Sequence, residues 1–254
     1  MSKEPTYEDY VGEEKTLEQI KDEKTGNMSL LNHLDELRTR LIRSMIAVGV
    51  CSLVAYFFIE DIVHYITLPA GKLYYMQPAE AFFTYLKVSV VSGFLIALPI
   101  VLYHVWRFFL PALTEKERGV LGLVVPISVF LFFIGLTFSY FLVLPAGIKF
   151  FLGFASNDLQ PLLSVGKYLD FVIAFILPFG FIFELPLVIM VLAKIGIISS
   201  AFLKKKRKIV IFLSFVVGAV ISPTPDVFSQ TMIAVPIMIL YEISILIVCY
   251  LLKK

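Results

Sequence analysis

The chain has 254 residues, of which 59% are hydrophobic and only 17% are charged, with a formal net charge of +2. A soluble globular protein carries about 25% charged and roughly 45–50% apolar residues, so this composition excludes an ordinary soluble domain. Apolar runs of about 20 residues, each able to cross a bilayer core of ~30 Å, indicate a multi-pass membrane protein. Cys51 and Cys249 lie within such runs, which favours small buried side chains over a disulfide framework.

The first 27 residues differ from the rest of the chain. They contain eight acidic and four basic residues and few apolar ones. This composition is typical of a solvated, disordered tail, and it lacks the basic start and apolar centre of a signal peptide. We therefore expect an acidic tail over residues 1–27 and a membrane domain over residues 28–254.

The segment SLLNHLDELRTRLIRS has the spacing of an amphipathic helix. Leu30, Leu34, Leu37 and Leu41 are separated by steps of four, three and four residues, which places them on one helical face. Charged and polar residues occupy the remaining positions. The pattern predicts a helix that lies at the membrane interface and leads into the first span.

Six apolar segments follow, and each is predicted to be a transmembrane helix, which gives an all-α membrane protein. The fifth segment has only 14 residues, roughly 21 Å at about 1.5 Å per residue, before SPTPD breaks the helix. Such a short span must thin the bilayer locally or rest against longer neighbours. The expected spans cover residues 43–59, 88–109, 119–144, 171–193, 209–222 and 230–252.

Basic residues are distributed unequally between the loops on the two sides of the membrane. Outside the tail, the side that carries both termini has fourteen lysines and arginines, including the run KKKRK at 204–208, whereas the other side has four: Lys72, Lys87, Lys149 and Lys167. The positive-inside rule then places both termini in the cytoplasm. A basic run beside a span is typical of a topology determinant facing anionic lipid, so we expect no nucleic-acid partner.

Motifs for the common hydrolytic and nucleotide-dependent chemistries are absent from the sequence. It has no HExxH, no P-loop and no GxSxG, and its three histidines have no paired metal spacing. We therefore expect no enzymatic activity, no catalytic residues, no metal and no cofactor. The chemistry that remains is a set of carboxylates: Glu36, Glu115, Glu117, Glu184, Asp226 and Glu242.

Some of these carboxylates lie outside the spans, and two lie inside them. Glu36 precedes Arg40 by four residues, so it is either an ordinary solvated helix pair or part of a binding site. Glu184 and Glu242 lie inside the fourth and sixth spans, where an ionised acid facing lipid costs at least about 2.5–3.5 kcal/mol. Such residues are seldom kept without a partner or a task. We expect Glu184 to lie near mid-bilayer and to face a wet concavity or a polar partner.

Four motifs, HLDELRTRL, PALTEKER, FGFIFELP and SPTPDVFSQ, occur in this order on the six spans. Together they resemble the TatC family of the twin-arginine translocase, from about Ser29 to the C-terminus. The acidic tail departs from the family pattern. The resemblance implies a cupped bundle of six helices in a bacterial-type inner (cytoplasmic) membrane. It also implies a receptor for twin-arginine signal peptides of folded proteins, which recruits single-span partner subunits into an oligomeric complex and uses the proton-motive force without nucleotide.

The same resemblance assigns roles to particular positions. Glu36 and Glu117 match the acidic residues that recognise the paired arginines, and a guanidinium fork binds a carboxylate in a way that lysine cannot. Glu184 matches a polar residue facing the hollow of the fold, where it could hold a polar side chain of a partner helix. The neighbouring site positions that match the family are Arg38, Phe108 and Pro111. From their places in the sequence, we expect Glu242 to be a second intramembrane polar contact and Pro225 and Asp226 to lie at the outer hairpin.

Two other functions remain open at this point. One is a proton-coupled transporter of small solutes, with Glu184 and Glu242 as proton carriers. Its typical signs, inverted repeats and paired broken helices, are not found in the sequence. The other is a purely structural assembly protein. Binding of a twin-arginine peptide separates the three.

Overall fold

The structure, a computed structural model, describes residues 30–109, 121–156 and 161–250. The regular elements in these ranges are helices, and the one further pairing is an isolated β-bridge between Tyr74 and Ser164. The all-α prediction is therefore confirmed. The α-helices are α2 (Leu30–Phe57), α3 (Ile59–Thr67), α4 (Pro78–Phe109), α5 (Leu121–Phe138), α6 (Leu144–Leu152), α7 (Val165–Phe183), α8 (Leu185–Ile195), α9 (Ser200–Ile221) and α10 (Val227–Tyr250). A short 3-10 turn, η1 (Leu68–Ala70), follows α3, and a π-helical segment, η4 (Ser139–Val143), joins α5 to α6.

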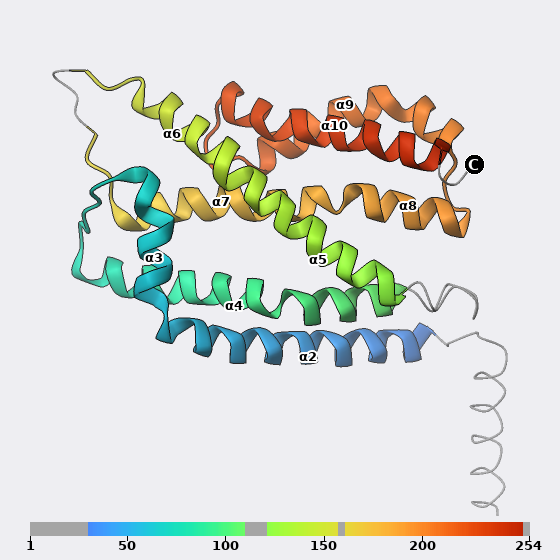
Figure 1. The fold of residues 1–254 in the computed structure, drawn as a ribbon, viewed down its shortest axis with the longest axis horizontal. Coiled ribbons are helices and arrows are strands. Elements are labelled where there is room, and N and C mark those ends of the chain that lie inside the picture. The colour runs from blue at the N-terminus through green and yellow to red at the C-terminus, as the bar shows by residue number, and fades with distance from the viewer. Residues whose placement is uncertain (1–29, 110–120, 157–160, 251–254) are drawn as a thin grey trace, which may run out of the picture.

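Figure 1 shows an elongated bundle in which the long helices run along one common direction. Helix α2 lies beside α4, helices α7 and α8 continue one another, and α9 pairs with α10 at the opposite edge. The rod formed by α5, η4 and α6 crosses obliquely over the bundle from α4 toward α10 (Figure 1). We refer to the end where α2, α5 and α9 begin and where α4, α8 and α10 end as the basic end.

Five segments in the described ranges are long and apolar enough to cross a membrane. Helix α9 is not among them, because its first turns carry KKKRK and only its second half is apolar. This second half contains most of the predicted short fifth span, and it lies against the longer helix α10. The five segments are His33–Phe57, Pro78–Phe108, Gly122–Leu152, Val165–Ile195 and Val227–Tyr250.

The amphipathic segment leads directly into the first span, as expected, since α2 runs without a break from Leu30 to Phe57. The fourth span is two helices, because α7 ends and α8 begins at Glu184. Pro186, in the first turn of α8, has no N–H for a hydrogen bond to the preceding turn, which explains the interruption.

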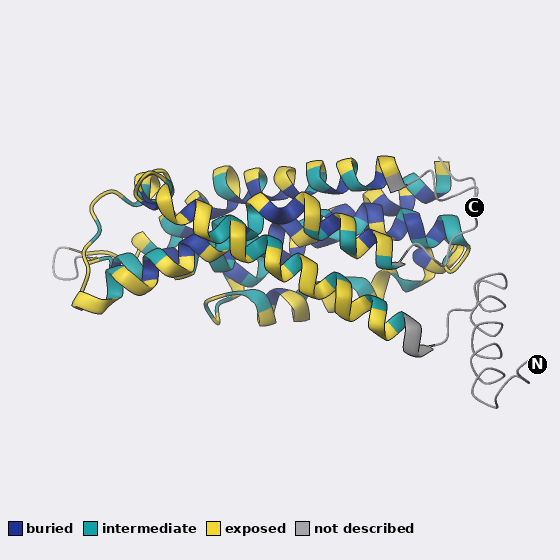
Figure 2. Cartoon of the chain, turned by 90° about the horizontal axis from the view of Figure 1, so that it is seen from below, coloured by how far each residue is buried: buried dark blue, intermediate teal, exposed yellow. Residues whose placement is uncertain are grey.

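The outer faces of the bundle are apolar. Figure 2 shows the buried residues along the middle of the bundle and the exposed faces turned outward. Phe57, Phe212 and Val220 are 84%, 68% and 80% exposed, and Leu34 and Leu41 of the amphipathic segment are also exposed. Exposed apolar faces on many helices are unfavourable in water but suit a hydrocarbon environment, in agreement with a multi-pass membrane protein.

Helices α5 and α7 cross at close range because two glycines face the opposite helix. A Cβ on Gly135 of α5 would lie 2.3 Å from the Phe179 carbonyl oxygen of α7. A Cβ on Gly180 of α7 would lie 2.4 Å from the ring of Phe132. Small residues at helix contacts allow this approach in membrane proteins. The close crossing brings the first half of α5 within side-chain reach of the junction between α7 and α8.

Candidate functional site

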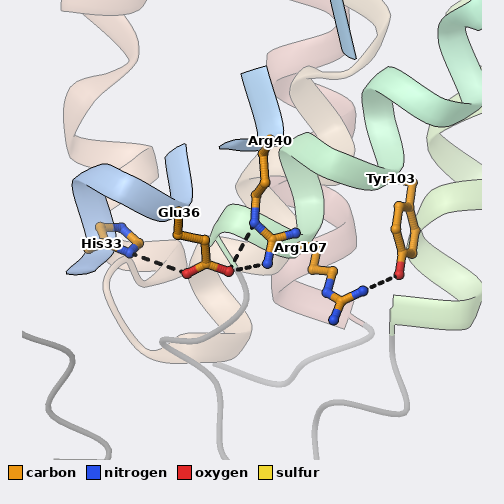
Figure 3. Close-up of polar contacts among 5 residues, drawn as sticks. All are labelled: His33, Glu36, Arg40, Tyr103 and Arg107. Atoms are coloured by element: carbon orange, nitrogen blue, oxygen red, sulfur yellow. Dashed lines mark hydrogen bonds and ion pairs between the residues drawn. The ribbon is translucent and has the colours of Figure 1, made fainter. Parts of the chain in front are cut away.

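At the basic end, the beginning of α2 presents a partly buried carboxylate. Glu36 Oε1 accepts a hydrogen bond from Arg40 Nε at 2.9 Å, and Arg40 Nη2 contacts the same oxygen. The other oxygen, Oε2, is buried, lies 4.0 Å from His33 Nδ1 and has no hydrogen-bond partner among the described residues (Figure 3). The side chains of Glu36 and Arg40 are 20% and 12% exposed, so this helix pair is more buried than an ordinary solvated one.

The end of α4 supplies aromatic and basic groups to the same region. The ring of Phe108 stacks on His33, with centroids 4.3 Å apart, and so ties α4 to α2. Arg107 Nη1 donates a hydrogen bond to the Tyr103 hydroxyl at 2.6 Å, and its guanidinium lies over that ring (Figure 3). The arrangement combines a carboxylate that has a free acceptor oxygen with flat aromatic surfaces. Both features suit the binding of a guanidinium group.

Not all predicted members of this region can be placed. Arg38 is exposed on α2, and Phe108 takes part through its stack on His33. Glu117 and Pro111 lie outside the described residues. His33, Tyr103 and Arg107 were not predicted. His33 carried a sequence signal, since it precedes Glu36 by three residues in HLDELR and therefore shares its helical face.

A second polar site lies inside the bundle around Glu184. Glu184 is 8% exposed, and its Oε2 accepts a hydrogen bond from Ser128 Oγ of α5 at 2.7 Å. Ser128 Oγ in turn accepts a hydrogen bond from Trp106 Nε1 of α4 at 2.9 Å. The remaining oxygen, Glu184 Oε1, is buried and has no hydrogen-bond partner within the described part of the chain. Ser128 and Trp106 were not predicted as members of this site.

Glu242, the second predicted intramembrane carboxylate, has an ion-pair partner within the chain. Its Oε2 lies 2.7 Å from Nη2 of Arg207, a residue of the KKKRK run on α9. Beside it, the Tyr241 hydroxyl donates a hydrogen bond to the Leu203 carbonyl oxygen at 2.8 Å. Both contacts join α9 to α10 near the basic end. Glu242 therefore differs from Glu184, which has no ion-pair partner in the described ranges.

Pro225 and Asp226, predicted to lie at the outer hairpin, are in the turn between α9 and α10. Asp226 Oδ1 accepts a hydrogen bond from the Ser229 amide at 2.8 Å and so caps the start of α10. Burial raises the pKa of Asp226, but hydrogen bonds from Thr224, Ser229 and Phe228 outweigh it and leave the pKa below its ordinary value. These contacts give Asp226 a structural role as a helix cap. Among the described residues, no group of His, Cys, Asp and Glu has the arrangement of a metal site.

Comparison with known proteins identifies the family. The family model described as Sec-independent protein translocase protein (TatC) matches residues 32–236. This chain belongs to the TatC family. The chain is therefore a multi-pass membrane protein of a protein-transport family, and the resemblance in its four motifs is confirmed.

Relatives and solved structures agree with the assignment over most of the chain. The Sec-independent protein translocase protein TatC of Desulforapulum autotrophicum is 47% identical over 221 residues, which cover 84% of this chain and 82% of that protein. The TatC of Escherichia coli K12 is 39% identical over 226 residues, with 85% and 86% coverage. A crystal structure of the twin arginine translocase receptor TatC has a TM-score of 0.78 at 39% identity, and covers 87% of this chain and 100% of its own. The TatC fold is thus confirmed for this chain.

Proposed function

We propose that this chain is the signal-peptide receptor and core subunit of a twin-arginine protein translocase. In this role it binds the paired arginines of a signal peptide at the basic end and recruits single-span partner subunits. The complex then exports the folded passenger across the membrane with the proton-motive force. The observation that carries the proposal is Glu36 in a TatC-family chain, with one buried carboxylate oxygen that has no hydrogen-bond partner among the described residues.

Arginine selectivity follows from the geometry around Glu36. Arg40 already occupies Oε1, so an incoming guanidinium binds at Oε2, next to the stacked rings of His33 and Phe108. A guanidinium is planar and can stack on these rings while it donates hydrogen bonds, whereas an ammonium group is compact and strongly hydrated. Glu117 is proposed as the acceptor for the second arginine.

The proposed location is the bacterial-type inner membrane, with the basic end in the cytoplasm. Arg38, Arg40, Arg107 and the KKKRK run of α9 all belong to this end. The cytoplasm is also where signal peptides of folded passengers are presented. The positive-inside rule and the place of the receptor site therefore support the same orientation.

Charge reversal at the two receptor carboxylates tests the proposal. Glu36→Lys and Glu117→Lys should each weaken binding of a twin-arginine peptide to the purified protein by well over the roughly 0–1 kcal/mol typical of exposed ion pairs. Glu60→Lys is the matched control, because Glu60 is exposed on α3 at the opposite end of the bundle and should not affect binding. If both receptor variants bound the twin-arginine peptide with unchanged affinity, Glu36 and Glu117 would have no part in recognition and the proposal would be refuted.

A further inference from the structure

Three buried side chains from different helices form a hydrogen-bonded line through the bundle. Trp106, Ser128 and Glu184 are 6%, 0% and 8% exposed, and the two bonds that join them measure 2.9 and 2.7 Å. Trp106 directly precedes Arg107 and Phe108 of the receptor region. The line therefore starts in the α4 turn that carries receptor side chains and ends at the interruption between α7 and α8.

When Glu184 is ionised, the chemistry of its two neighbours sets the direction of both bonds in this line. An indole N–H can only donate, so the Ser128 oxygen must accept from Trp106. Ser128 keeps its single hydroxyl proton, and an ionised Glu184 can only accept it, at Oε2. When Glu184 is ionised, Oε2 is thus occupied and Oε1 is the oxygen left for a further group.

Glu184 Oε1 is the one atom of this line that is left without a bond in the described structure. A buried carboxylate oxygen without a hydrogen bond is costly, and more so in a membrane, where water does not replace the missing donor. A group from outside the described residues is therefore needed to complete the site. When Glu184 is ionised, that group must be a hydrogen-bond donor.

We propose that Trp106 and Ser128 are positioning residues, which hold Glu184 so that only Oε1 is presented to a hydrogen-bond donor on the transmembrane helix of a partner subunit. This inference rests on the proposed function, which supplies the partner. Side-chain amides and hydroxyls have the required chemistry, since they carry a donor without a charge that must be buried. A partner carboxylate is excluded when both acids are ionised, because neither then has a proton to share.

The chain contains a built-in probe of the line, because Trp106 is its only tryptophan. The indole N–H vibration, measured by ultraviolet resonance Raman on the purified full-length protein, therefore reports the bond from Trp106 to Ser128 alone. Ser128→Ala should shift this band to the position of a free N–H. Glu184→Leu should leave it unchanged, since Ser128 still accepts from Trp106. An unshifted band in Ser128→Ala would show that the line does not exist.

The positioning role is tested by the amount of single-span partner subunits that copurify with each variant. Ser128→Ala should reduce it about tenfold, a ratio that corresponds to about 1.4 kcal/mol, and so approach the level of Glu184→Leu. Ser139→Ala is the matched control, because Ser139 is also 0% exposed but donates to the Phe175 carbonyl oxygen and should retain the wild-type amount. Full partner recovery in Ser128→Ala would overturn the inference.

Binding of a twin-arginine peptide separates this inference from the proposed function. Ser128→Ala should bind the peptide as the wild type does, because the receptor groups around Glu36 are untouched. If the wild-type protein itself binds no such peptide, the proposed function fails, while the Raman band still decides whether Trp106 and Ser128 form the line. Loss of peptide binding in Ser128→Ala alone would indicate a general folding defect and contradict a positioning role.

Discussion

Glu184 shows why a membrane helix can keep a carboxylate that lipid alone would disfavour. Its Oε2 is hydrogen-bonded to Ser128, and its Oε1 is buried beside the break between two helices. A lipid-facing acid would be exposed on the outside of the bundle, whereas Glu184 is 8% exposed. Of the two positions expected for Glu184, a wet concavity or a polar partner, the described contacts supply a polar partner. The remaining oxygen gives the residue the capacity to bind a further group.

Two substitutions at Glu184 distinguish hydrogen bonding from proton transfer. In Glu184→Gln, Ser128 donates to the amide oxygen and the amide N–H₂ replaces Oε1. A partner amide or hydroxyl can then accept a hydrogen bond from this N–H₂ instead of donating one. Transport should then be largely retained. Glu184→Leu should insert normally but lose most transport, because it leaves Ser128 and the partner donor unpaired. Transport assays on both variants, side by side, measure this.

The two competing outcomes are distinct. A proton carrier would fail in both variants, because glutamine cannot take up and release a proton. Loss of transport in Glu184→Gln would therefore favour a relay, and full transport in Glu184→Leu would leave the carboxylate without a role.

At the level of elements, the crossing of α5 over α7 places Ser128 where it can contact Glu184. Gly135 lies seven residues, about two helical turns, after Ser128 and touches the α7 backbone at Phe179. Because the side chain of serine is short, a small increase in the distance between the helices would break its bond to Glu184. The packing of two glycines thus supports a polar contact two turns away.

A pair of glycine substitutions on α5 tests this dependence. Gly135→Ala places a Cβ 2.3 Å from a carbonyl oxygen of α7, which should cost roughly 1–3 kcal/mol of unfolding free energy and weaken the bond between Ser128 and Glu184. Gly122→Ala, on the same helix, meets no atom within 4 Å and should be neutral or stabilising by up to about 1 kcal/mol. Denaturation of both variants in detergent measures the difference. Equal stability would show that the crossing tolerates separation.

The sequence predicted the helices well because apolar length identifies spans directly. It predicted the ends of the helices less well. Helix α4 begins at Pro78 rather than at residue 88, because its first turns are too polar to be recognised as part of a span. Glu184 could be predicted because a charge within an apolar run is visible locally. Its contacts with Ser128 and Trp106 could not, since these residues lie 56 and 78 positions earlier and meet it only through the helix crossings.

For the whole molecule, the account requires that the basic end faces the cytoplasm. A cysteine at Asn157, between α6 and α7, should react with an impermeant thiol reagent added outside intact cells, whereas one at Ser200, at the start of α9, should react only after lysis. Cys51 and Cys249 are replaced by serine in both variants, so that each protein has a single thiol. The opposite labelling pattern would reverse the orientation and separate the receptor site from the cytoplasm.

The central claim is that this chain recognises paired arginines through carboxylates at the basic end, and one affinity comparison tests it most directly. Two signal peptides that differ only in a twin arginine or a twin lysine are titrated against the purified full-length protein. A planar guanidinium can donate to Oε2 of Glu36 and stack on the rings of His33 and Phe108 at the same time, whereas the ammonium group of lysine cannot stack in this way. We predict that the twin-arginine peptide binds at least about tenfold more tightly, which corresponds to about 1.4 kcal/mol. Equal affinity for the two peptides would contradict the account.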